Sequence, residues 1–443
     1  MKPSFSAETL VRGTGGAWSV RPPSRATGIS KDTRSLRPGE LYVALRGERF
    51  DGHAFVEAAF AAGAVGAMVE EGYAGPEPGP LLRVRDPLDG LRSLACAYRD
   101  TWRASVVGIT GSVGKTTVKE MIASVLSEKG KTHRTEGNLN NHIGLPLSML
   151  AMPTDAETGV FELGMSRPGE IAELAELLRP EIGVVVAVGA AHLEAFGSVE
   201  EIADEKGALP ARLPEDGAAW IDADSEWAER LRARSAAPVR TVSLSGEADC
   251  AGRPVPGGVE VDGFFYPLRW PGRHVALNAL FAIALGREAG LGPEGIAAGL
   301  AAVRLPGMRW EERESGGVRF VNDAYNANPL SMRAALRTFA EDRRAGARWA
   351  VLGAMRELGE AARTEHVELG RFLAGLDLDG VVAVGEEAAE MATENVSKTL
   401  PVRDVSEAAR LLKERLRPGD AVLLKASRGE RLERIIELFE KEP

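Results

Sequence analysis

A glycine-rich loop at residues 108–117, Gly-Ile-Thr-Gly-Ser-Val-Gly-Lys-Thr-Thr, constrains the fold more than any other segment of the chain. An apolar run at 105–110 leads into it, and residues 118–126, apolar at helical spacing, follow it. A strand, a glycine loop and a helix in this order form a phosphate cradle, because backbone N–H groups and the helix N-terminus point at phosphate oxygens. The segment therefore predicts an α/β domain with a parallel sheet and a bound nucleotide.

The glycines of this loop depart from the common P-loop pattern, G-x-x-x-x-G-K-[ST]. Ile109 stands where that pattern has its first glycine, and Gly108 and Gly111 precede Gly114 instead. A chance glycine-rich turn is the alternative interpretation, but Gly-Lys-Thr-Thr between a strand and a helix disfavours it. Lys115 is placed to neutralise terminal phosphates, and Thr116 to offer a hydroxyl to Mg²⁺.

Charge and composition limit the partners of the chain. Its 443 residues predict about three domains, and a formal net charge of −10 argues against a broad basic face for nucleic acid. Cys96 and Cys250, the two cysteines, have no metal-type neighbours. No run of about 18 apolar residues marks a membrane span. We expect no nucleic-acid partner, no membrane insertion and a cytoplasmic location.

Apolar strands alternate with helices along the chain, which predicts parallel sheets covered by helices. We expect strands at 40–45, 105–110, 159–163, 182–188, 348–353, 380–384 and 420–425, a loosely β-like stretch at 238–270, and helices at 54–62, 88–102, 118–126, 170–178, 275–289, 331–340, 361–375, 406–416 and 430–441. Pro306 and Gly307 indicate a hinge before the last region.

Polar side chains follow two strands of the predicted central sheet. Glu162 ends the strand at 159–163, and ligands gather at the carboxyl ends of such strands, so it can hold Mg²⁺ with Thr116. A surface glutamate is an equally open interpretation. His192 follows the next strand, but Mg²⁺ prefers oxygen, so the residues alone favour a loop histidine. Lys206 lies among acidic helix residues, which is typical of a solvated face.

Three further polar segments precede or interrupt predicted elements. Residues 322–329, Asn-Asp-Ala-Tyr-Asn-Ala-Asn-Pro, come directly before a helix, so a turn with an N-cap is slightly favoured over contacts to a ribose or a base. Residues 30–34 and 50–53 carry polar clusters between apolar strand residues. Loops so placed can bind ligands but are more often turns.

Together these motifs resemble the Mur ligases, ATP-dependent amide-forming enzymes of peptidoglycan synthesis. The loop at 110–117 is general to the family. The segments at 137–146, 161–165 and 323–329 resemble the branch that adds D-alanyl-D-alanine. The resemblance covers essentially the whole chain in order.

The resemblance implies an α/β fold of three domains. Residues 1–84 would bind the UDP-sugar, 85–307 would form a P-loop ATPase-type parallel sheet, and 308–443 a Rossmann-like domain. ATP would phosphorylate the terminal carboxylate of UDP-MurNAc-tripeptide, and D-Ala-D-Ala would attack the acyl phosphate. Such chemistry needs charge neutralisation, here by Lys115 and two Mg²⁺ ions. The matching lysine of the family is typically carbamylated, which would make Lys206 an oxygen ligand. We expect a monomer.

The resemblance also assigns residues to roles. The catalytic residues would be Lys115, Glu162, His192 and Lys206, and the metal ligands Thr116, Glu162, His192 and the carbamate of Lys206. The ATP-binding residues would be Thr110, Gly111, Ser112, Val113, Gly114, Lys115, Thr116, Thr117, His274, Asn278, Arg309, Asp323 and Asn326. The UDP-substrate would contact Ser30, Asp32, Thr33, Arg34, Asp51, Gly52, His53, Asn138, Asn140 and Asn141. The dipeptide would contact Tyr325, Asn328, Glu357, His366, Lys425, Ser427 and Arg428.

The chain departs from the family pattern at five positions, Val186, Ala187, Ala208, Ala354 and Ala426. The family usually has Thr-Asn at the first two, often Glu at the third, and usually Asp and Gly at the last two. Two alternatives therefore stay open. One is a sibling ligase, either a diaminopimelate- or lysine-adding enzyme or a folylpolyglutamate synthetase. The other is a Mur-like nucleotide-binding module without catalysis.

Overall fold

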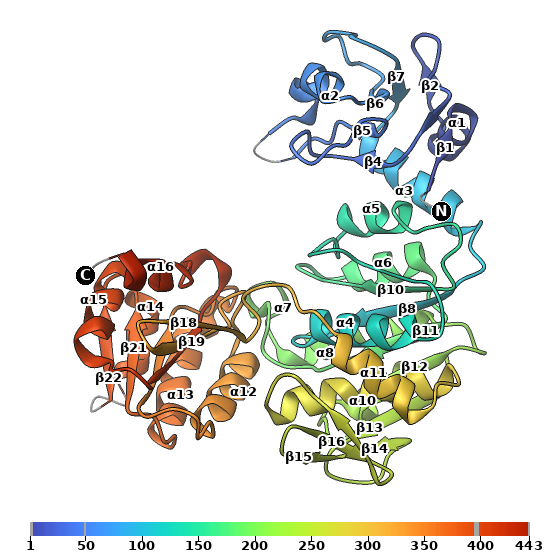
Figure 1. The fold of residues 1–443 in the computed structure, drawn as a ribbon. Coiled ribbons are helices and arrows are strands. Elements are labelled where there is room, and N and C mark those ends of the chain that lie inside the picture. The colour runs from blue at the N-terminus through green and yellow to red at the C-terminus, as the bar shows by residue number, and fades with distance from the viewer. Residues whose placement is uncertain (1–2, 48–49, 394–397, 442–443) are drawn as a thin grey trace.

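A computed structural model of the chain describes residues 3–47, 50–393 and 398–441. They form three α/β lobes, drawn in Figure 1 in blue, in cyan to yellow and in orange to red. We name them by the predicted limits: the N-terminal lobe (3–84), the central lobe (85–307) and the C-terminal lobe (308–441). Each contains a largely parallel sheet, so the predicted fold class is confirmed. The domain limits themselves stay a prediction.

The N-terminal lobe is made of short elements. They are β1 (Phe5–Ser6), α1 (Ala7–Thr14), β2 (Ala17–Trp18), β3 (Arg25–Ala26), β4 (Ile29–Ser30), β5 (Leu41–Val43), the 3-10 turn η1 (Gly52–Phe55), α2 (Val56–Ala61), β6 (Gly66–Glu70) and β7 (Leu81–Val84). The main sheet has the order β2-β7-β6-β5-β4. The helix expected at 54–62 is split, because the Asp51 carboxylate accepts the His53 N–H and starts η1 before α2.

The central lobe is an α/β sandwich followed by a small antiparallel sheet. Its elements are α3 (Pro87–Arg99), β8 (Ser105–Thr110), α4 (Lys115–Ser127), β9 (Thr132–Arg134), α5 (Gly144–Leu150), β10 (Thr158–Glu162), α6 (Glu170–Leu178), β11 (Ile182–Val185), α7 (Leu193–Phe196), α8 (Val199–Lys206), η2 (Pro210–Arg212), β12 (Ala218–Asp222), α9 (Ala228–Arg234), β13 (Val239–Ser243), β14 (Cys250–Ala251), β15 (Arg253–Val255), β16 (Gly258–Val261), β17 (Phe264–Pro267), α10 (Arg273–Glu288) and α11 (Pro293–Ala302). The β-like stretch expected at 238–270 is the run from β13 to β17.

The parallel sheet of the central lobe has the order β14-β13-β12-β11-β8-β10-β9. The P-loop strand β8 lies between β11 and β10, with Ile109 opposite Glu162 and Thr110 opposite Val185. The carboxyl ends of the three strands therefore meet at one edge, where an open α/β sheet binds ligands. The largely buried α10 packs against α4 below this edge.

Two differences from the predicted bounds of these elements bear on the P-loop. Helix α4 begins at Lys115, three residues before the expected start, because Gly114, at φ 82°, turns the chain directly into the helix. Strand β11 ends at Val185 rather than at 188. The next residues serve the P-loop instead, where the Ala187 carbonyl accepts the Ser112 N–H at 2.8 Å.

The C-terminal lobe begins with a hairpin. Its elements are β18 (Glu311–Ser315), β19 (Val318–Asn322), α12 (Pro329–Ala340), β20 (Arg348–Leu352), η3 (Gly359–Ala361), α13 (Ala362–Ala374), β21 (Gly380–Val384), α14 (Glu386–Ala389), η4 (Glu390–Ala392), β22 (Thr399–Val402), α15 (Val405–Arg415), β23 (Ala421–Lys425), η5 (Arg428–Glu430) and α16 (Arg434–Lys441). The sheet order is β18-β19-β23-β20-β21-β22, with only β18 antiparallel. Helix α16 starts later than the expected 430, because Arg431 adopts a left-handed conformation at φ 52°.

Candidate active site

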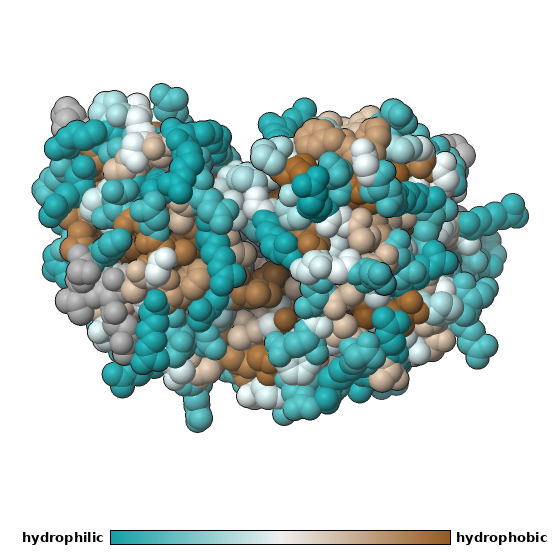
Figure 2. Space-filling view, turned by 90° about the horizontal axis from the view of Figure 1, so that it is seen from below, coloured by the Kyte–Doolittle hydropathy of each residue, from teal (hydrophilic) through white to brown (hydrophobic). Residues whose placement is uncertain are grey.

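A cleft of about 780 Å³ lies between the central and C-terminal lobes. Seen from below, a furrow separates the two lobes, with hydrophobic residues in its floor and hydrophilic residues along its rims (Figure 2). The P-loop residues 112–117, the end of β10 and the turn at 323–328 all line this cleft. It therefore joins the two segments that the sequence marked most clearly.

The P-loop has the backbone geometry of a phosphate cradle. Gly111 and Gly114 have φ of 157° and 82°, a region that residues with a Cβ rarely adopt. A Cβ at Gly114 would also lie only 2.8 Å from Val186 and 3.0 Å from the Asn278 amide oxygen. The loop is thus held in one shape by its neighbours, with the N-terminus of α4 facing the cleft.

Lys115 lies in this loop in a poorly solvated position. Its ammonium donates to the Gly111 carbonyl at 2.6 Å and lines the cleft. Desolvation lowers its pKa from the ordinary value, although the Glu162 carboxylate opposes this effect. An anion that enters the cleft would supply the counter-charge that the lysine lacks.

Glu162 is the centre of a buried hydrogen-bond network at the end of β10. Its side chain accepts from the Thr116 hydroxyl at 3.0 Å and from the Asn140 amide at 2.8 Å. Arg309 donates in turn to the Thr116 hydroxyl at 3.0 Å. The chain from Arg309 through Thr116 to Glu162 crosses from the hinge to the sheet. Two of the predicted metal ligands, Thr116 and Glu162, therefore lie together with the predicted ATP residue Arg309.

Lys206 is buried at the end of α8, outside the lining of the cleft. The only hydrogen-bond partner of its ammonium among the described residues is the Met165 sulfur at 3.4 Å. Desolvation, reinforced by the charge of Lys115, lowers the pKa of Lys206 well below its ordinary value. The structure thus overturns the solvated helix face that the surrounding acidic residues suggested, because the lysine points to the interior of the fold.

His192 meets the opposite wall of the cleft. Its Nδ1 forms an ion pair with Glu357 of the C-terminal lobe, and this contact holds the pKa of Glu357 below its usual value. The backbone supports the contact, since the Glu194 N–H donates to the Glu357 carbonyl at 3.1 Å. Both His192 and Glu357 have positive φ, 61° and 65°, so the contact fixes two unfavourable backbone conformations.

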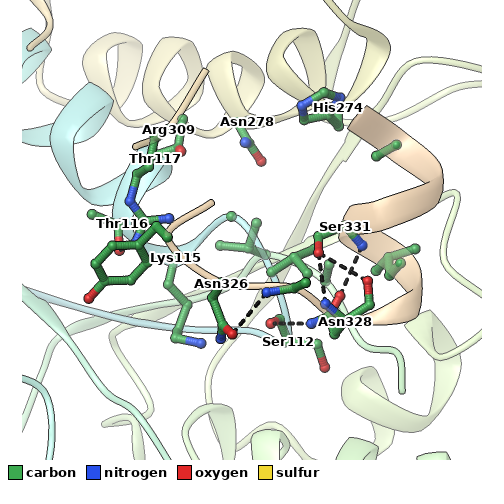
Figure 3. Close-up of a pocket in the computed structure, with 18 of the residues that line it drawn as sticks. Ser112, Lys115, Thr116, Thr117, His274, Asn278, Arg309, Asn326, Asn328 and Ser331 are labelled. Atoms are coloured by element: carbon green, nitrogen blue, oxygen red, sulfur yellow. Dashed lines mark hydrogen bonds between the residues drawn. The ribbon is translucent and has the colours of Figure 1, made fainter. Parts of the chain in front are cut away.

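The turn at 323–328 positions the remaining polar side chains. Asn328 caps α12 in a capping box with Ser331, and its amide reaches the Ser112 carbonyl at 3.3 Å (Figure 3). The Tyr325 ring lies under the Arg309 guanidinium at 4.1 Å. The segment is therefore both the N-cap that the residues alone favoured and a wall of the cleft.

The other ATP residues predicted from the sequence surround the same space. Figure 3 shows His274 and Asn278 on α10, across the pocket from the turn that carries Asn326. Burial lowers the pKa of His274 to about 4, so its ring is neutral at pH 7. Asp323 lines the cleft and is held by Lys425 at 2.6 Å. Thr110 and Gly111 are the exceptions, because neither lines the cleft, and Thr110 lies buried at the end of β8 behind the loop.

The predicted dipeptide residues divide into two groups. Tyr325, Asn328, Glu357 and Lys425 line the cleft. The other three, His366, Ser427 and Arg428, do not, and the structure differs here from the expectation.

His366 is fully buried, with its ring nitrogens bonded to the Met355 N–H at 3.0 Å and the Ala362 carbonyl at 2.7 Å. Ser427 accepts the Arg356 N–H at 2.9 Å, and Arg428 pairs with Glu433 at 2.7 Å. These three side chains are engaged in holding the loops behind the wall.

The predicted UDP-substrate residues fall in separate places. Asn138, Asn140 and Asn141 line the central cleft. Asp51 and His53 line a cavity of about 450 Å³ in the N-terminal lobe, bordered also by Arg46, Glu70 and Tyr73. Gly52 lies buried beside this cavity.

The turn that carries Ser30, Asp32, Thr33 and Arg34 lines neither cavity. Arg34 donates to the Asp32 carboxylate through its backbone and its guanidinium, and this lowers the pKa of Asp32 to about 2. The structure therefore gathers the UDP-substrate residues only in part.

Several cleft residues were missed by the sequence analysis. Asp222 ends β12, and burial raises its pKa to about 6. Asp224, Trp227 and Trp270 line the same side, and the buried indole N–H of Trp227 has no partner among the described residues. The sequence does contain a signal for Asp222. Like Glu162, it ends an apolar run, and ligands gather at the carboxyl ends of such strands.

The residues of the cleft fit ATP and Mg²⁺. The buried Arg309 Nε has no hydrogen-bond partner in the described part of the chain, as expected for a group that awaits an anion. Within the same part, no three His, Cys, Asp or Glu side chains cluster as metal ligands. Mg²⁺ needs no such cluster, since it is usually held by one or two carboxylates and substrate phosphates. Glu162 and Thr116 supply protein oxygens of that kind.

At most of the positions where the chain departs from the family pattern, the backbone rather than the side chain makes the local contacts. Ala187 contributes its backbone carbonyl to Ser112, and Val186 covers Gly111. Ala354 and Ala426 are buried, and the Ala426 methyl would lie 2.8 Å from a Cβ at Gly353. These substitutions keep the loop shapes, because the backbone makes the contacts.

No helix within the described ranges is long and apolar enough to cross a membrane.

Models of Mur ligase domains match three consecutive segments of the chain. The Mur ligase family catalytic domain matches residues 25–77, the Mur ligase middle domain 109–286, and the Mur ligase glutamate ligase domain 308–428. The last two contain the P-loop and the turn at 323–328, the two sides of the cleft.

Relatives of known name match nearly end to end. The chain is 37% identical over 428 residues to the UDP-N-acetylmuramoyl-tripeptide–D-alanyl-D-alanine ligase of Bacillus subtilis, with 92% of each protein covered. The crystal structure of MurF from Acinetobacter baumannii has a TM-score of 0.90 at 30% identity, with 99% of this chain and 100% of that chain covered. The structure of MurF ligase from Thermotoga maritima in complex with ADP has a TM-score of 0.82 at 32% identity, with 94% and 97% covered.

Proposed function

This chain belongs to the Mur ligase family, and we propose that its cleft joins D-alanyl-D-alanine to UDP-N-acetylmuramoyl-tripeptide at the expense of ATP. The products would be UDP-MurNAc-pentapeptide, ADP and phosphate, in peptidoglycan precursor synthesis. One observation carries the proposal: the P-loop, Glu162 and the turn at 323–328 line a single cleft. A nucleotide on the loop and substrates held by the other lobe can therefore meet there.

The reaction proceeds in two transfers. The terminal carboxylate of the tripeptide attacks the γ-phosphorus of ATP, the bond to ADP breaks, and an acyl phosphate forms. The amine of D-Ala-D-Ala then attacks the acyl carbon, loses a proton, and expels phosphate as the amide forms. Negative charge moves between oxygens in both steps, so fixed cationic groups stabilise the transition states.

Three features of this chain would stabilise that negative charge. The N–H groups at the start of α4 and the Lys115 ammonium face the phosphates from the central lobe. Arg309 faces them from the hinge, where its guanidinium already lies on the Thr116 hydroxyl. The Tyr325 ring under Arg309 keeps the guanidinium in place.

Thr116 and Glu162 would hold the first of two Mg²⁺ ions, and Glu162, His192 and a carbamate on Lys206 the second. When bound, Mg²⁺ neutralises nucleotide and carboxylate oxygens. The environment of Lys206 supports the carbamate, since burial lowers its pKa and so favours the unprotonated amine, the form that adds to CO₂ with loss of a proton. His192 would have to leave Glu357 to bind a metal ion.

Substrate dependence of ATP turnover tests the function. We would measure ADP and phosphate release with Mg-ATP and UDP-MurNAc-tripeptide, with and without D-Ala-D-Ala, and identify the product by mass. Release that requires the dipeptide and yields UDP-MurNAc-pentapeptide is the expected result. A monomeric state and a cytoplasmic location belong to the same proposal.

The control reactions separate the alternatives. D-Glu, meso-diaminopimelate and L-Lys, each with its own UDP-precursor, test the sibling ligases, and turnover with one of them would overturn the proposed substrate. ATP binding without turnover on any pair would support a non-catalytic module instead. The intact set Lys115, Glu162, His192 and Lys206 argues against that outcome.

A further inference from the structure

A buried cluster behind Glu162 has no role in the chemistry described so far. Lys119 on α4 and Thr135, the residue after β9, have no solvent-exposed surface. The Lys119 ammonium donates to the Thr135 carbonyl at 2.7 Å, and it lies 3.1 Å from the Glu120 carboxylate. Buried lysines are rare because their desolvation is costly, so this one requires an explanation.

The Thr135 hydroxyl contacts the backbone of Glu162, whose carboxylate is proposed to hold Mg²⁺. Strands β9 and β10 pair in parallel, and the Thr135 N–H donates to the Val160 carbonyl at 3.0 Å as the last backbone contact between them. One step further, the Glu162 N–H donates to the Thr135 hydroxyl at 3.1 Å instead of to a carbonyl. The hydroxyl therefore fixes the backbone from which the Glu162 carboxylate projects.

Lys119 connects the same point to the P-loop helix. It lies one turn after Thr116 on α4, so its bond to Thr135 ties this helix to the end of β9. Thr116 and Glu162, which touch at 3.0 Å on the cleft side, are thus also joined from behind. The loop that follows Thr135 carries Asn140, the second donor to Glu162.

We propose that Lys119 and Thr135 are positioning residues that hold the Glu162 carboxylate and the Thr116 hydroxyl at the spacing a divalent cation requires. Neither residue touches the substrate. Their effect passes through the backbone of Glu162 and the orientation of α4. The inference rests on the proposed ATP- and Mg²⁺-dependent function.

Two variants of Thr135 test the role of its hydroxyl. Thr135→Val removes the hydroxyl with little change of shape, and Thr135→Ser restores it. Ser148→Ala is the matched control, because the buried Ser148 hydroxyl also donates to the Thr135 hydroxyl, at 3.3 Å, but does not touch Glu162. Lys119→Met removes the other half of the cluster, and melting temperatures show which variants fold.

The readout is the binding of a non-hydrolysable ATP analogue, measured by calorimetry without Mg²⁺ and over a range of free Mg²⁺. For Thr135→Val, the gain in affinity that Mg²⁺ provides should fall by about 10- to 100-fold, the usual effect of losing an outer-shell partner of a metal ligand. Affinity without Mg²⁺ should change little. Thr135→Ser and Ser148→Ala should keep the wild-type gain.

Three outcomes would overturn the inference. They are an unchanged Mg²⁺ gain in Thr135→Val, an equal loss in Ser148→Ala, and a loss that Thr135→Ser does not restore. Each of these leaves the proposed function standing, because the wild-type protein still binds the analogue in an Mg²⁺-dependent way. A wild-type protein without Mg²⁺-dependent binding would overturn both the inference and the proposed function.

Discussion

The two walls of the cleft are stabilised in different ways. The central wall (112–117, 138–141 and 162) is internally bonded, since Glu162 accepts from Thr116 and Asn140 within one lobe. The C-terminal wall (323–328 and 357) reaches across by isolated contacts, such as Asn328 to Ser112 and Glu357 to His192. An internally bonded wall that carries the P-loop and Glu162 thus faces a wall that meets it through a few exchangeable bonds.

The difference between the walls assigns them two roles: the central wall is preorganised, and the contacts that cross the cleft govern its closure. The central wall holds the charge-stabilising groups before any ligand binds, which is the arrangement that lowers the reorganisation cost of catalysis. In the contacts that cross the cleft, Arg309 and His192 engage partners that an incoming phosphate or metal ion would displace. Variants of the central wall should therefore change the chemical step most, and variants of the crossing contacts should change substrate affinity.

The largest effect is expected at Lys206, behind the central wall. Lys206→Ala should lower kcat by on the order of 10³-fold, because the proposed carbamate ligand of the second Mg²⁺ ion, whose charge would stabilise the transition state, is lost. A short carboxylic acid added to the variant should restore part of the rate. The melting temperature at pH 7 should not fall, since the variant removes a desolvated amine that has no hydrogen-bond partner in the described ranges besides the Met165 sulfur. Full activity in the variant would exclude the carbamate role.

Arg309 tests the crossing contacts. Arg309→Ala should lower kcat/KM by about 10²-fold, because the guanidinium touches Thr116, lines the cleft and would face the phosphates of the proposed nucleotide. Arg313→Ala is the matched control, since Arg313 lies on the adjacent hairpin, pairs with Glu311 at 2.8 Å and lines no part of the cleft. Equal losses in the two variants would mean that Arg309 acts only through the fold of the hinge.

The same contrast explains what the sequence could predict. The glycine loop and the carboxyl-end rule located Glu162 and His192, because both signals are local to one sheet. Asp222 obeys the same rule, but its run at 218–222 begins with two alanines, which are uncommon in strands, so it indicates a strand less clearly than the run before Glu162. His366 was assigned to the dipeptide by resemblance and is buried instead, since its ring bonds to backbone groups that only tertiary packing brings near.

His133 on β9, behind the central wall, should make the stability of the protein depend on pH. Burial lowers its pKa from the ordinary 6.5 to about 4, and its Nε2 bonds to the Ser148 carbonyl at 2.9 Å. Between pH 6.5 and pH 4 the unfolded chain binds a proton at His133 and the folded chain does not. The contribution of neutral His133 to the free energy of unfolding is therefore fully present above pH 6.5 and is lost as the pH falls to 4. The loss amounts to at most about 3 kcal/mol.

His133→Gln should weaken this dependence. Melting temperatures of the variant and the wild type should converge as the pH falls from 7.5 to 4, because glutamine carries no titrating group. The gap at pH 7.5, where the ring is neutral in both states, measures the packing cost of the substitution alone. A gap that stays constant over the whole range would show that the folded chain takes up the proton at His133 as readily as the unfolded chain.

The smallest effect is expected at the backbone contact between the walls. Gly359 has φ 54°, and a Cβ there would lie 3.1 Å from the Glu194 Cα of the central lobe. Gly359→Ala should raise the KM for ATP by up to about tenfold, since backbone strain and the close approach cost about 1–2 kcal/mol. Gly385→Ala is matched for strain, because Gly385 has φ 88° and no heavy atom within 4 Å of its Cβ position.

The pair of glycine variants separates strain from contact between the lobes. Both should lower the melting temperature, because alanine is unfavourable at a positive φ. Only Gly359→Ala should also raise the KM, since it alone pushes Glu357 and the η3 turn away from the loop of His192 and Glu194. A rise in KM for both variants would mean that the C-terminal lobe responds to strain as a whole. The crossing contacts would then have no separate part in binding the nucleotide.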